Sequence, residues 1–370
     1  MYHTYITIIH ICNSINTIPP EIFSSQYWHC IMLTCSHALR MKRPVILFCQ
    51  LVLTGVAFAE LSPMPIVQAA MGGHVHPSIA RTSNGTLVVA YQGKGVLMHA
   101  RLIKGAENWE APKAIPGTDW RPEYIQKTPH VEVYPCSLDR LPDDRLLLTW
   151  NYIGADKAKD YYARPLIGSI SSVTGLTWGK PFILGPLGEK DLGAMRHSML
   201  PLSKTEWLLP LRQVAPVIFN EKTRALTPFP IKTIDGKSHL AVQIVKTAKG
   251  TLLAMAPDLL RSTDGGKLWQ PVAGFPGIAE GDNAQGRFLT PLDDGRVVLT
   301  WGVDRNNKGI RYNISSNDGK TWSPTRHVLE NHDVTARYGS ARTVQVGKGV
   351  IGTVYFNRFG LFFVRMPLNK

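Results

Sequence analysis

Short polar turns, often with glycine, recur along the chain, and each precedes a run of apolar β-forming residues. The first reads Ser-Asn-Gly-Thr at 83–86 before Leu-Val-Val at 87–89. Aligned on Gly85, six such turns are centred on positions 85, 144, 205, 250, 295 and 349. Each copy predicts a tight hairpin followed by a buried strand. Repeats of several strands at this spacing are typical of propeller blades. The pattern therefore predicts an all-β fold, a six-bladed β-propeller.

A second repeat follows the pattern Ser-x-Asp-x-Gly-x-x-Trp. The copy at 262–269 is complete, the copy at 315–322 has Asn317 in place of the aspartate, and the copy at 171–178 has Val173 there. Trp109 ends a further copy that lacks the serine, aspartate and glycine of the pattern. Serine and aspartate side chains bond turn amides, glycine accepts positive φ, and tryptophan buries a large face. We therefore expect Asp264 to hold the fold rather than to catalyse.

These two repeats resemble the sialidase (neuraminidase) superfamily, whose members carry BNR or Asp-box repeats, over residues 74 to 365. The resemblance implies one domain at 60–370, a six-bladed propeller with four antiparallel strands per blade. It also implies that the Ser-x-Asp-x-Gly-x-x-Trp repeats lie in turns away from the active site. It also implies a glycoside hydrolase of the exo-alpha-sialidase family, with Tyr338 in a Tyr-Gly-Ser context as the nucleophile. The sequence departs from the family where His76 and Pro257 stand in places expected to carry arginines.

The region before residue 60 reads as a targeting segment. A basic start at 41–43, an apolar run at 44–56 and Ala-Phe-Ala at 57–59 predict a secretory signal peptide at 41–59. The apolar run is shorter than the roughly 20 residues of a spanning helix, so we expect no stable membrane anchor. We expect translation to begin at Met41, with 1–40 as a non-native upstream extension. Cleavage leaves Cys136 as the single cysteine, which gives a secreted or periplasmic protein without an internal disulfide.

The charge balance favours anionic partners. The chain has a net charge of +14, and cleavage removes three basic residues and one acidic residue, which leaves +12. In an exported protein this favours an acidic oligo- or polysaccharide as the substrate. No cluster of basic and aromatic residues indicates nucleic-acid binding, so no nucleic-acid partner is expected. No metal-ligand spacing or nucleotide-binding glycine motif is diagnostic, so neither a metal nor a cofactor is predicted.

The candidate site follows from strand length. Counting back eight to eleven residues from each turn, along the predicted innermost strand, reaches the mouth of the central channel. Histidine and tyrosine exchange protons, and arginine holds carboxylates through two hydrogen bonds. The catalytic candidates at these positions are Tyr338, His76, His239 and Tyr134. The substrate-binding candidates are Arg196, His197, Arg287, Arg337, Gln285 and Asp282.

The residues alone are compatible with three functions. The first is a sialidase-like hydrolase with Tyr338 as nucleophile and arginines on a substrate carboxylate. The second is a propeller-fold polysaccharide lyase, in which a histidine base and a tyrosine acid perform β-elimination on a uronate. No carboxylate pair stands out of the kind that ordinary glycosidases need. The third is a propeller that binds glycan without catalysis.

Overall fold

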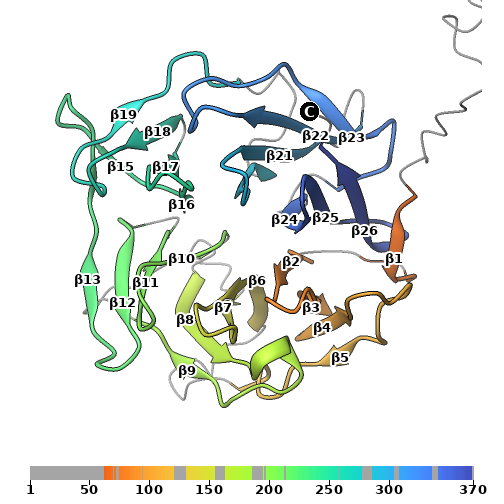
Figure 1. Cartoon of the computed structure of the whole chain (residues 1–370). Helices are drawn as coiled ribbons and strands as arrows, with labels where there is room; N and C mark the ends of the chain where they lie inside the picture. The colour runs from red at the N-terminus through yellow and green to blue at the C-terminus, as the bar shows by residue number, and fades with distance from the viewer. Residues whose placement is uncertain are drawn as a thin grey trace, which may run out of the picture. The chain divides into compact units, whose positions relative to one another are not determined.

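The computed structural model describes residues 62–69, 71, 75–93, 95–120, 131–154, 163–185, 195, 197–211, 214–256, 258–276, 286–303, 308–335 and 341–368. The chain divides into two compact units, Met1–Phe58 and Ala59–Lys370, and all the described residues belong to the second. Within them lie six four-stranded antiparallel sheets, a two-stranded hairpin and one 3-10 turn at Val173–Gly175. The six sheets form a ring (Figure 1).

Each sheet is one blade, numbered here along the chain from the innermost strand outward. Blade 1 is β2 (Ser78–Arg81), β3 (Leu87–Gly93), β4 (Val96–Leu102) and β5 (Lys113–Ala114). Blade 2 is β6 (Val131–Arg140), β7 (Leu146–Gly154), β8 (Ala163–Ile170) and β9 (Phe182–Ile183). Blade 3 is β10 (Leu200–Pro201), β11 (Glu206–Leu209), β12 (Val217–Asn220) and β13 (Leu226–Pro228).

The other three blades complete the ring. Blade 4 is β16 (Gln243–Lys246), β17 (Leu252–Met255), β18 (Leu259–Ser262) and β19 (Gln270–Pro271). Blade 5 is β20 (Phe288–Pro291), β21 (Val297–Val303), β22 (Gly309–Ser315) and β23 (Arg326–Glu330). Blade 6 is β24 (Arg342–Gly347), β25 (Val350–Asn357), β26 (Gly360–Pro367) and β1 (Met64–Val67).

The ring is closed by the first strand of the domain. β1 pairs antiparallel with β26, with Met64 opposite Phe363, and so becomes the outermost strand of blade 6. The same blade therefore holds both the first and the last described strands, and the chain that follows β1 continues directly into blade 1. This pairing fastens blade 6 to blade 1 through the backbone.

The six turns predicted from the sequence each join the first and second strands of a blade, so the six-bladed, four-stranded antiparallel propeller is confirmed. Gly85 and Gly295, both with positive φ, close their turns by donating to the carbonyl oxygens of Thr82 and Leu292 at 3.0 Å. Because successive strands run in opposite directions, these turns and the third-to-fourth-strand turns share one end of the ring. We call this end the hairpin face. The other end, where the innermost strands begin, is the mouth face.

The Ser-x-Asp-x-Gly-x-x-Trp segments occupy turns between the third and fourth strands of blades 2, 4 and 5, here called the box turns. In blade 4, the Asp264 carboxylate accepts from the Ser262 hydroxyl at 2.7 Å and from the Lys267 amide at 3.0 Å. Gly266 has φ +91°, and a Cβ there would lie 2.4 Å from a ring carbon of Phe229. These contacts give Asp264 a structural role within the turn, on the hairpin face.

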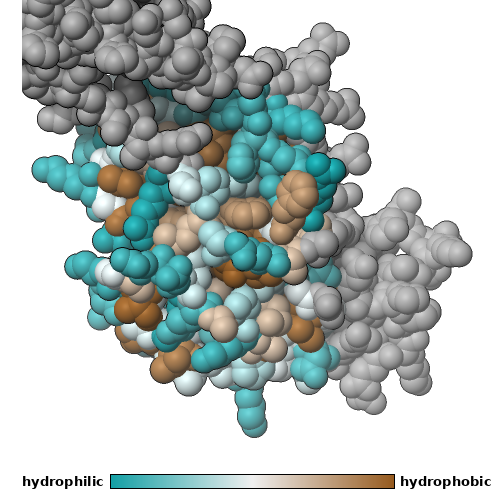
Figure 2. Space-filling view, turned by 90° about the vertical axis from the view of Figure 1, so that its right-hand side faces the viewer, coloured by the Kyte–Doolittle hydropathy of each residue, from teal (hydrophilic) through white to brown (hydrophobic). Residues whose placement is uncertain are grey.

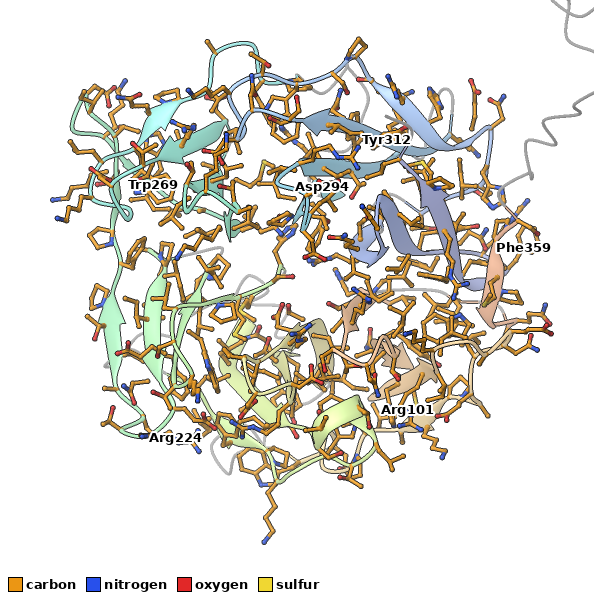
Figure 3. The ribbon with its side chains drawn as sticks, viewed as in Figure 1. Arg101, Arg224, Trp269, Asp294, Tyr312 and Phe359 are labelled. Atoms are coloured by element: carbon orange, nitrogen blue, oxygen red, sulfur yellow. The ribbon has the colours of Figure 1, made fainter. Side chains whose placement is uncertain are left out.

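The hydrophobic core lies between neighbouring blades. Trp269 of blade 4 is fully buried and packs with Leu208 of blade 3. Tyr312 of blade 5 packs in the same way with Ile351 and Tyr355 of blade 6. Figure 3 labels Trp269 and Tyr312 in these positions. Since each core cluster is shared by two sheets, the blades are held at fixed positions around the central cavity.

Candidate functional site

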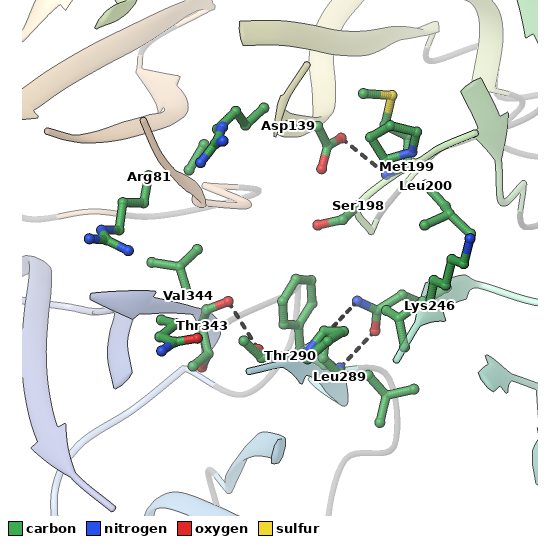
Figure 4. Close-up of a pocket in the computed structure, with 18 of the residues that line it drawn as sticks. Arg81, Asp139, Ser198, Met199, Leu200, Lys246, Leu289, Thr290, Thr343 and Val344 are labelled. Atoms are coloured by element: carbon green, nitrogen blue, oxygen red, sulfur yellow. Dashed lines mark hydrogen bonds between the residues drawn. The ribbon is translucent and has the colours of Figure 1, made fainter. Parts of the chain in front are cut away.

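The innermost strands surround a cavity of about 490 Å³ (Figure 4). Side chains connect neighbouring strands of its wall through backbone groups. The Ser78 hydroxyl of β2 accepts from the Leu138 amide of β6 at 2.9 Å. The buried Gln243 side chain of β16 accepts from the Leu289 amide of β20 at 2.8 Å and donates to the Leu289 carbonyl at 2.9 Å. These bonds fix the spacing of the strands that position the site.

Asp139 brings a buried carboxyl group to this wall. Its side chain points into the opening beside Ser198 (Figure 4), and the residue is 6% exposed. One carboxylate oxygen accepts from the Met199 amide at 3.1 Å and from the Ser137 hydroxyl at 3.0 Å. Burial raises the pKa of Asp139 to about 6, although these hydrogen bonds and the positive charge of Arg342 act to lower it. The group therefore changes charge in a mildly acidic range.

Phe288, the first residue of β20, brings two cation-forming side chains together. The His197 ring is stacked on the Phe288 ring, with centroids 5.9 Å apart and an interplanar angle of 20°. The Arg342 guanidinium carbon lies 5.0 Å from the centre of the same ring. Both His197 and Arg342 are buried. A guanidinium held against an aromatic ring is oriented in a way that suits two parallel hydrogen bonds to a carboxylate.

The backbone is strained where two neighbouring innermost strands begin. His76, just before β2, has φ +42° and is followed by Pro77, and Ala341, just before β24, has φ +70°. Both residues are buried at the start of an innermost strand, whereas the other non-glycine residues of positive φ in the described parts of the chain, the buried Asp318 among them, lie in turns or connections elsewhere. Such strain costs about 1–3 kcal/mol per residue and tends to occur at functional sites. It marks the mouth ends of β2 and β24.

Arg287 supplies a further cation at the mouth side of blade 5. It directly precedes β20, and its guanidinium carbon lies 5.4 Å from the centre of the Phe275 ring. Burial lowers the pKa of Arg287, and the charge of Asp258 partly offsets this effect. An arginine stays protonated near neutral pH even with such a shift. The predicted position of Arg287 at the start of an innermost strand agrees with the structure.

His239 does not lie where the strand count placed it. It belongs to β15 (Ser238–His239), which pairs with β14 (Ile231–Lys232) in a hairpin between blades 3 and 4. Its ring nitrogen Nε2 is 3.2 Å from the Thr233 hydroxyl, and Thr233 forms a bridge to Trp269 beside the outermost strand of blade 4 (Figure 1). The innermost strand starts only at Gln243. The count was wrong here because this extra hairpin precedes a strand of only four residues.

Of the other predicted residues, His76 lies two positions before β2 and His197 lies three positions before β10, close to the starts of these innermost strands. Tyr134 lies in β6, the innermost strand of blade 2. The side chain of Tyr134 is outside the described part of the structure, and so are five whole residues: Arg196, Asp282, Gln285, Arg337 and Tyr338. Ala341 and Arg342 follow Tyr338 directly along the chain.

The sequence reasoning missed Asp139 and Arg342. Arg342 is seven residues before the centre of its turn, one short of the range that was searched. Asp139 is the ninth of the ten residues of β6 and so lies far from the mouth end of its strand, where the candidates were expected. Among the described residues, no three His, Cys, Asp or Glu side chains form a possible metal site. No helix in the same residues has the length and apolar character required to span a bilayer.

No family model matches the sequence, and no curated protein matches it. Solved structures with the same fold do match it. A protein of unknown function from Dyadobacter fermentans is 17% identical, with a TM-score of 0.59, and the match covers 83% of this chain and 98% of that protein. The Hadza microbial sialidase Hz136 is 13% identical, with a TM-score of 0.55 and coverage of 83% and 68%. A mutant of the NanB sialidase from Streptococcus pneumoniae is 11% identical, with a TM-score of 0.58 and coverage of 83% and 71%. The chain therefore shares the propeller fold found in sialidases.

Proposed function

We propose that the protein is an exported sialidase-fold glycoside hydrolase that acts on an acidic oligo- or polysaccharide. The observation that best supports this proposal is that Arg342 and His197 pack on Phe288, which lines the same cavity as the buried carboxyl group of Asp139. A sugar carboxylate fits the guanidinium of Arg342, and Arg287 adds positive charge on the mouth side. Electrostatic attraction in a partly dehydrated channel is stronger than in bulk water.

The proposed chemistry assigns Tyr338 as the nucleophile at the anomeric carbon of the substrate. His76 then accepts or returns a proton near neutral pH, as does Tyr134 if its side chain reaches the substrate. Arg196, Arg287, Arg337 and Arg342 bind the carboxylate. Gln285, Asp282 and His197 bind sugar hydroxyl groups. His239 receives no role, because it lies in the hairpin between blades 3 and 4.

A polysaccharide lyase is the competing function, and one observation favours it. In the described wall of the cavity, Asp139 is the only buried carboxyl group, and the other aspartate that lines it, Asp293, is exposed. A hydrolase of the ordinary two-carboxylate kind would need such a pair. β-Elimination needs instead a base, an acid and a cation on the uronate, which His76, Tyr338 and Arg342 could supply.

The test uses the protein purified after export by its host. Sialylated and uronate-containing glycans are supplied in turn, and the products are separated and weighed by mass spectrometry. We expect release of a saturated acidic sugar, and a loss of at least roughly 10³-fold in kcat/KM for Tyr338→Phe, as for other removed nucleophiles. Tyr312→Phe is the matched control, because Tyr312 lies in the core between blades 5 and 6.

Two results would overturn the proposal. An unsaturated uronate as the product, seen as an absorbance rise, would assign the lyase. Full activity in Tyr338→Phe would remove the assigned nucleophile from either mechanism.

A further inference from the structure

Exposed aliphatic side chains gather on the hairpin face. Of the ten large hydrophobic side chains that are exposed in the described residues, six lie in turns at this end, with exposures from 40% for Ile103 to 68% for Ile234. The six are Ile103, Val173, Leu176, Leu202, Ile234 and Leu268. Ile234 is placed beside the box turn of blade 4 by the hydrogen bond from its amide to the Trp269 carbonyl. The six side chains come from five turns, on blades 1 to 4 and the β14–β15 hairpin.

Exposed lysines occupy the turns of the same face. Lys237, which shares the β14–β15 turn with Ile234, pairs with Asp235 at 2.7 Å. In the part of the chain that the structure describes, the other exposed turn lysines of this face form no ion pair. Blades 1, 3, 4, 5 and 6 each contribute at least one such turn residue, and blade 2 has Lys180 just after its box turn. The turn lysines are Lys104, Lys204, Lys222, Lys249, Lys267, Lys320 and Lys348.

The carboxylates of these turns are largely neutralised by arginines instead. Asp144 pairs with Arg140 at 3.0 Å, and Asp294 pairs with Arg296 at 2.7 Å. Asp143 and Glu221 both pair with Arg145, and Asp318 pairs with Arg261. The arginines therefore offset the local negative charge, and the lysines remain available to an external anion.

The chain enters the propeller from the same side. β1 runs from Met64, opposite Phe363, to Val67, opposite Leu361, and so proceeds toward the mouth face. β26 runs the opposite way and ends opposite Val350, next to a hairpin-face turn. Residues 62–63, which directly precede β1, thus lie on the side of the hairpin face.

From these observations we propose that the hairpin face docks reversibly on an anionic lipid bilayer and leaves the mouth face open to a polymeric substrate. The lysines attract lipid phosphate groups, and the aliphatic side chains enter the interface between headgroups and acyl chains. By contrast, the rim of the ring around β1 and β26 shows only small, separate hydrophobic areas among hydrophilic ones (Figure 2). This inference does not depend on the reaction that the channel performs.

The test is flotation of the exported protein with vesicles. We expect the protein to float with phosphatidylglycerol vesicles and not with phosphatidylcholine vesicles at low ionic strength. Binding should fall by at least tenfold near 1 M salt, where the screening length is about 3 Å. Equal binding to both lipids would overturn the proposal, because an apolar anchor upstream of β1 would then explain it.

Variants separate the two contributions of the face. Lys249→Glu, Lys267→Glu and Lys320→Glu combined should weaken binding by at least tenfold. Leu176→Ser with Leu268→Ser should weaken it by at least threefold. The matched controls are Lys308→Glu and Phe359→Ser, since both residues are exposed and lie toward the mouth face.

The outcomes are distinguishable. If the lysine variants lost vesicle binding and the aliphatic variants kept it, the face would bind anions by charge alone. That result would overturn bilayer docking in favour of a soluble polyanion as the partner. Equal losses in the mouth-face controls would show attraction by net charge only, and so would also overturn the proposal. Unchanged thermal unfolding in each variant establishes that the change is at the surface. The catalytic assay should be unaffected by all of them on soluble substrates.

Discussion

The two ends of the propeller channel are built differently. At the hairpin face, the turns are short, close on themselves by local hydrogen bonds, and carry residues such as Asp264 and Asn84 that bond amides within two to four positions. At the mouth face, buried charged and strained residues such as His76 and Arg342 come from strands far apart in the sequence. Local hydrogen bonds within each turn therefore form the hairpin face, whereas residues from several blades come together to form the mouth face. Within the hairpin face, Asp294, in a first-to-second-strand turn, lies nearer the channel than Arg224, in a third-to-fourth-strand turn (Figure 3).

The largest expected difference between the two ends is in catalysis. Arg342→Gln should lower kcat/KM by roughly 10³-fold, close to 4 kcal/mol of transition-state binding, because it removes the cation that we assign to the substrate carboxylate. Arg296→Gln, on the hairpin face and paired with Asp294, should leave kcat/KM unchanged. Steady-state kinetics on the acidic substrate provides the measurement. An equal loss in both variants would mean that the two ends do not differ in function.

For the free energy of unfolding, we expect a large effect at the hairpin face. Trp269→Ala removes a fully buried side chain between blades 3 and 4 and should lower the free energy of unfolding by about 3–5 kcal/mol. Trp322, the matching residue of the blade 5 box turn, is only half-buried, so Trp322→Ala should cost less. Denaturant unfolding compares the two. A larger loss for Trp322→Ala would contradict the packing described for blade 4.

Asp139 predicts how stability depends on pH. Its carboxyl pKa rises from an ordinary 3.8 to about 6 on folding, so ionisation is harder in the folded protein. The contribution of neutral Asp139 to the free energy of unfolding is therefore fully present below pH 4 and is lost as the pH rises through 6. The total loss is at most about 3 kcal/mol. Asp139→Asn should remove this dependence from unfolding curves measured between pH 4 and 8. In Asp294, where Arg296 lowers the carboxyl pKa, the sign is opposite, and Asp294→Asn should leave the Asp139 transition in place.

The smallest effects are expected within the box turns. Asp264→Ala should cost about 1 kcal/mol, since the carboxylate accepts hydrogen bonds from the amides of Lys267 and Leu268. Asn317→Asp should change stability by less than about 0.5 kcal/mol, because Asn317 already accepts from the Thr321 amide at 2.9 Å. Thermal unfolding of both variants checks this order. If Asn317→Asp proved the larger change, the hydrogen bond that the Asn317 side-chain amide donates to the Thr321 hydroxyl at 2.8 Å would contribute more than the carboxylate of Asp264.

The sequence predicted the fold well because its signals are local. The turns at Gly85 and Gly295 need positive φ, and a glycine beside polar residues reveals such positions without knowledge of the rest of the chain. The site was predicted less well because it depends on strand lengths and on added elements. The β14–β15 hairpin displaced His239, and Arg342 lies one position outside a count that assumed similar strands. Asp139 has no local pattern, since its raised pKa arises from burial, which exists only in the folded ring.

The mass of the product released from a carboxylated glycan by the exported protein is the most direct test of the proposed hydrolase. Hydrolysis adds one water across the glycosidic bond, so we predict a saturated acidic sugar whose formation requires both Tyr338 and Arg342. A product lighter by one water, with an unsaturated ring, would contradict hydrolysis and assign elimination. Absence of any product from sialylated and uronate-containing glycans would contradict both reactions and leave a propeller that binds glycan without catalysis.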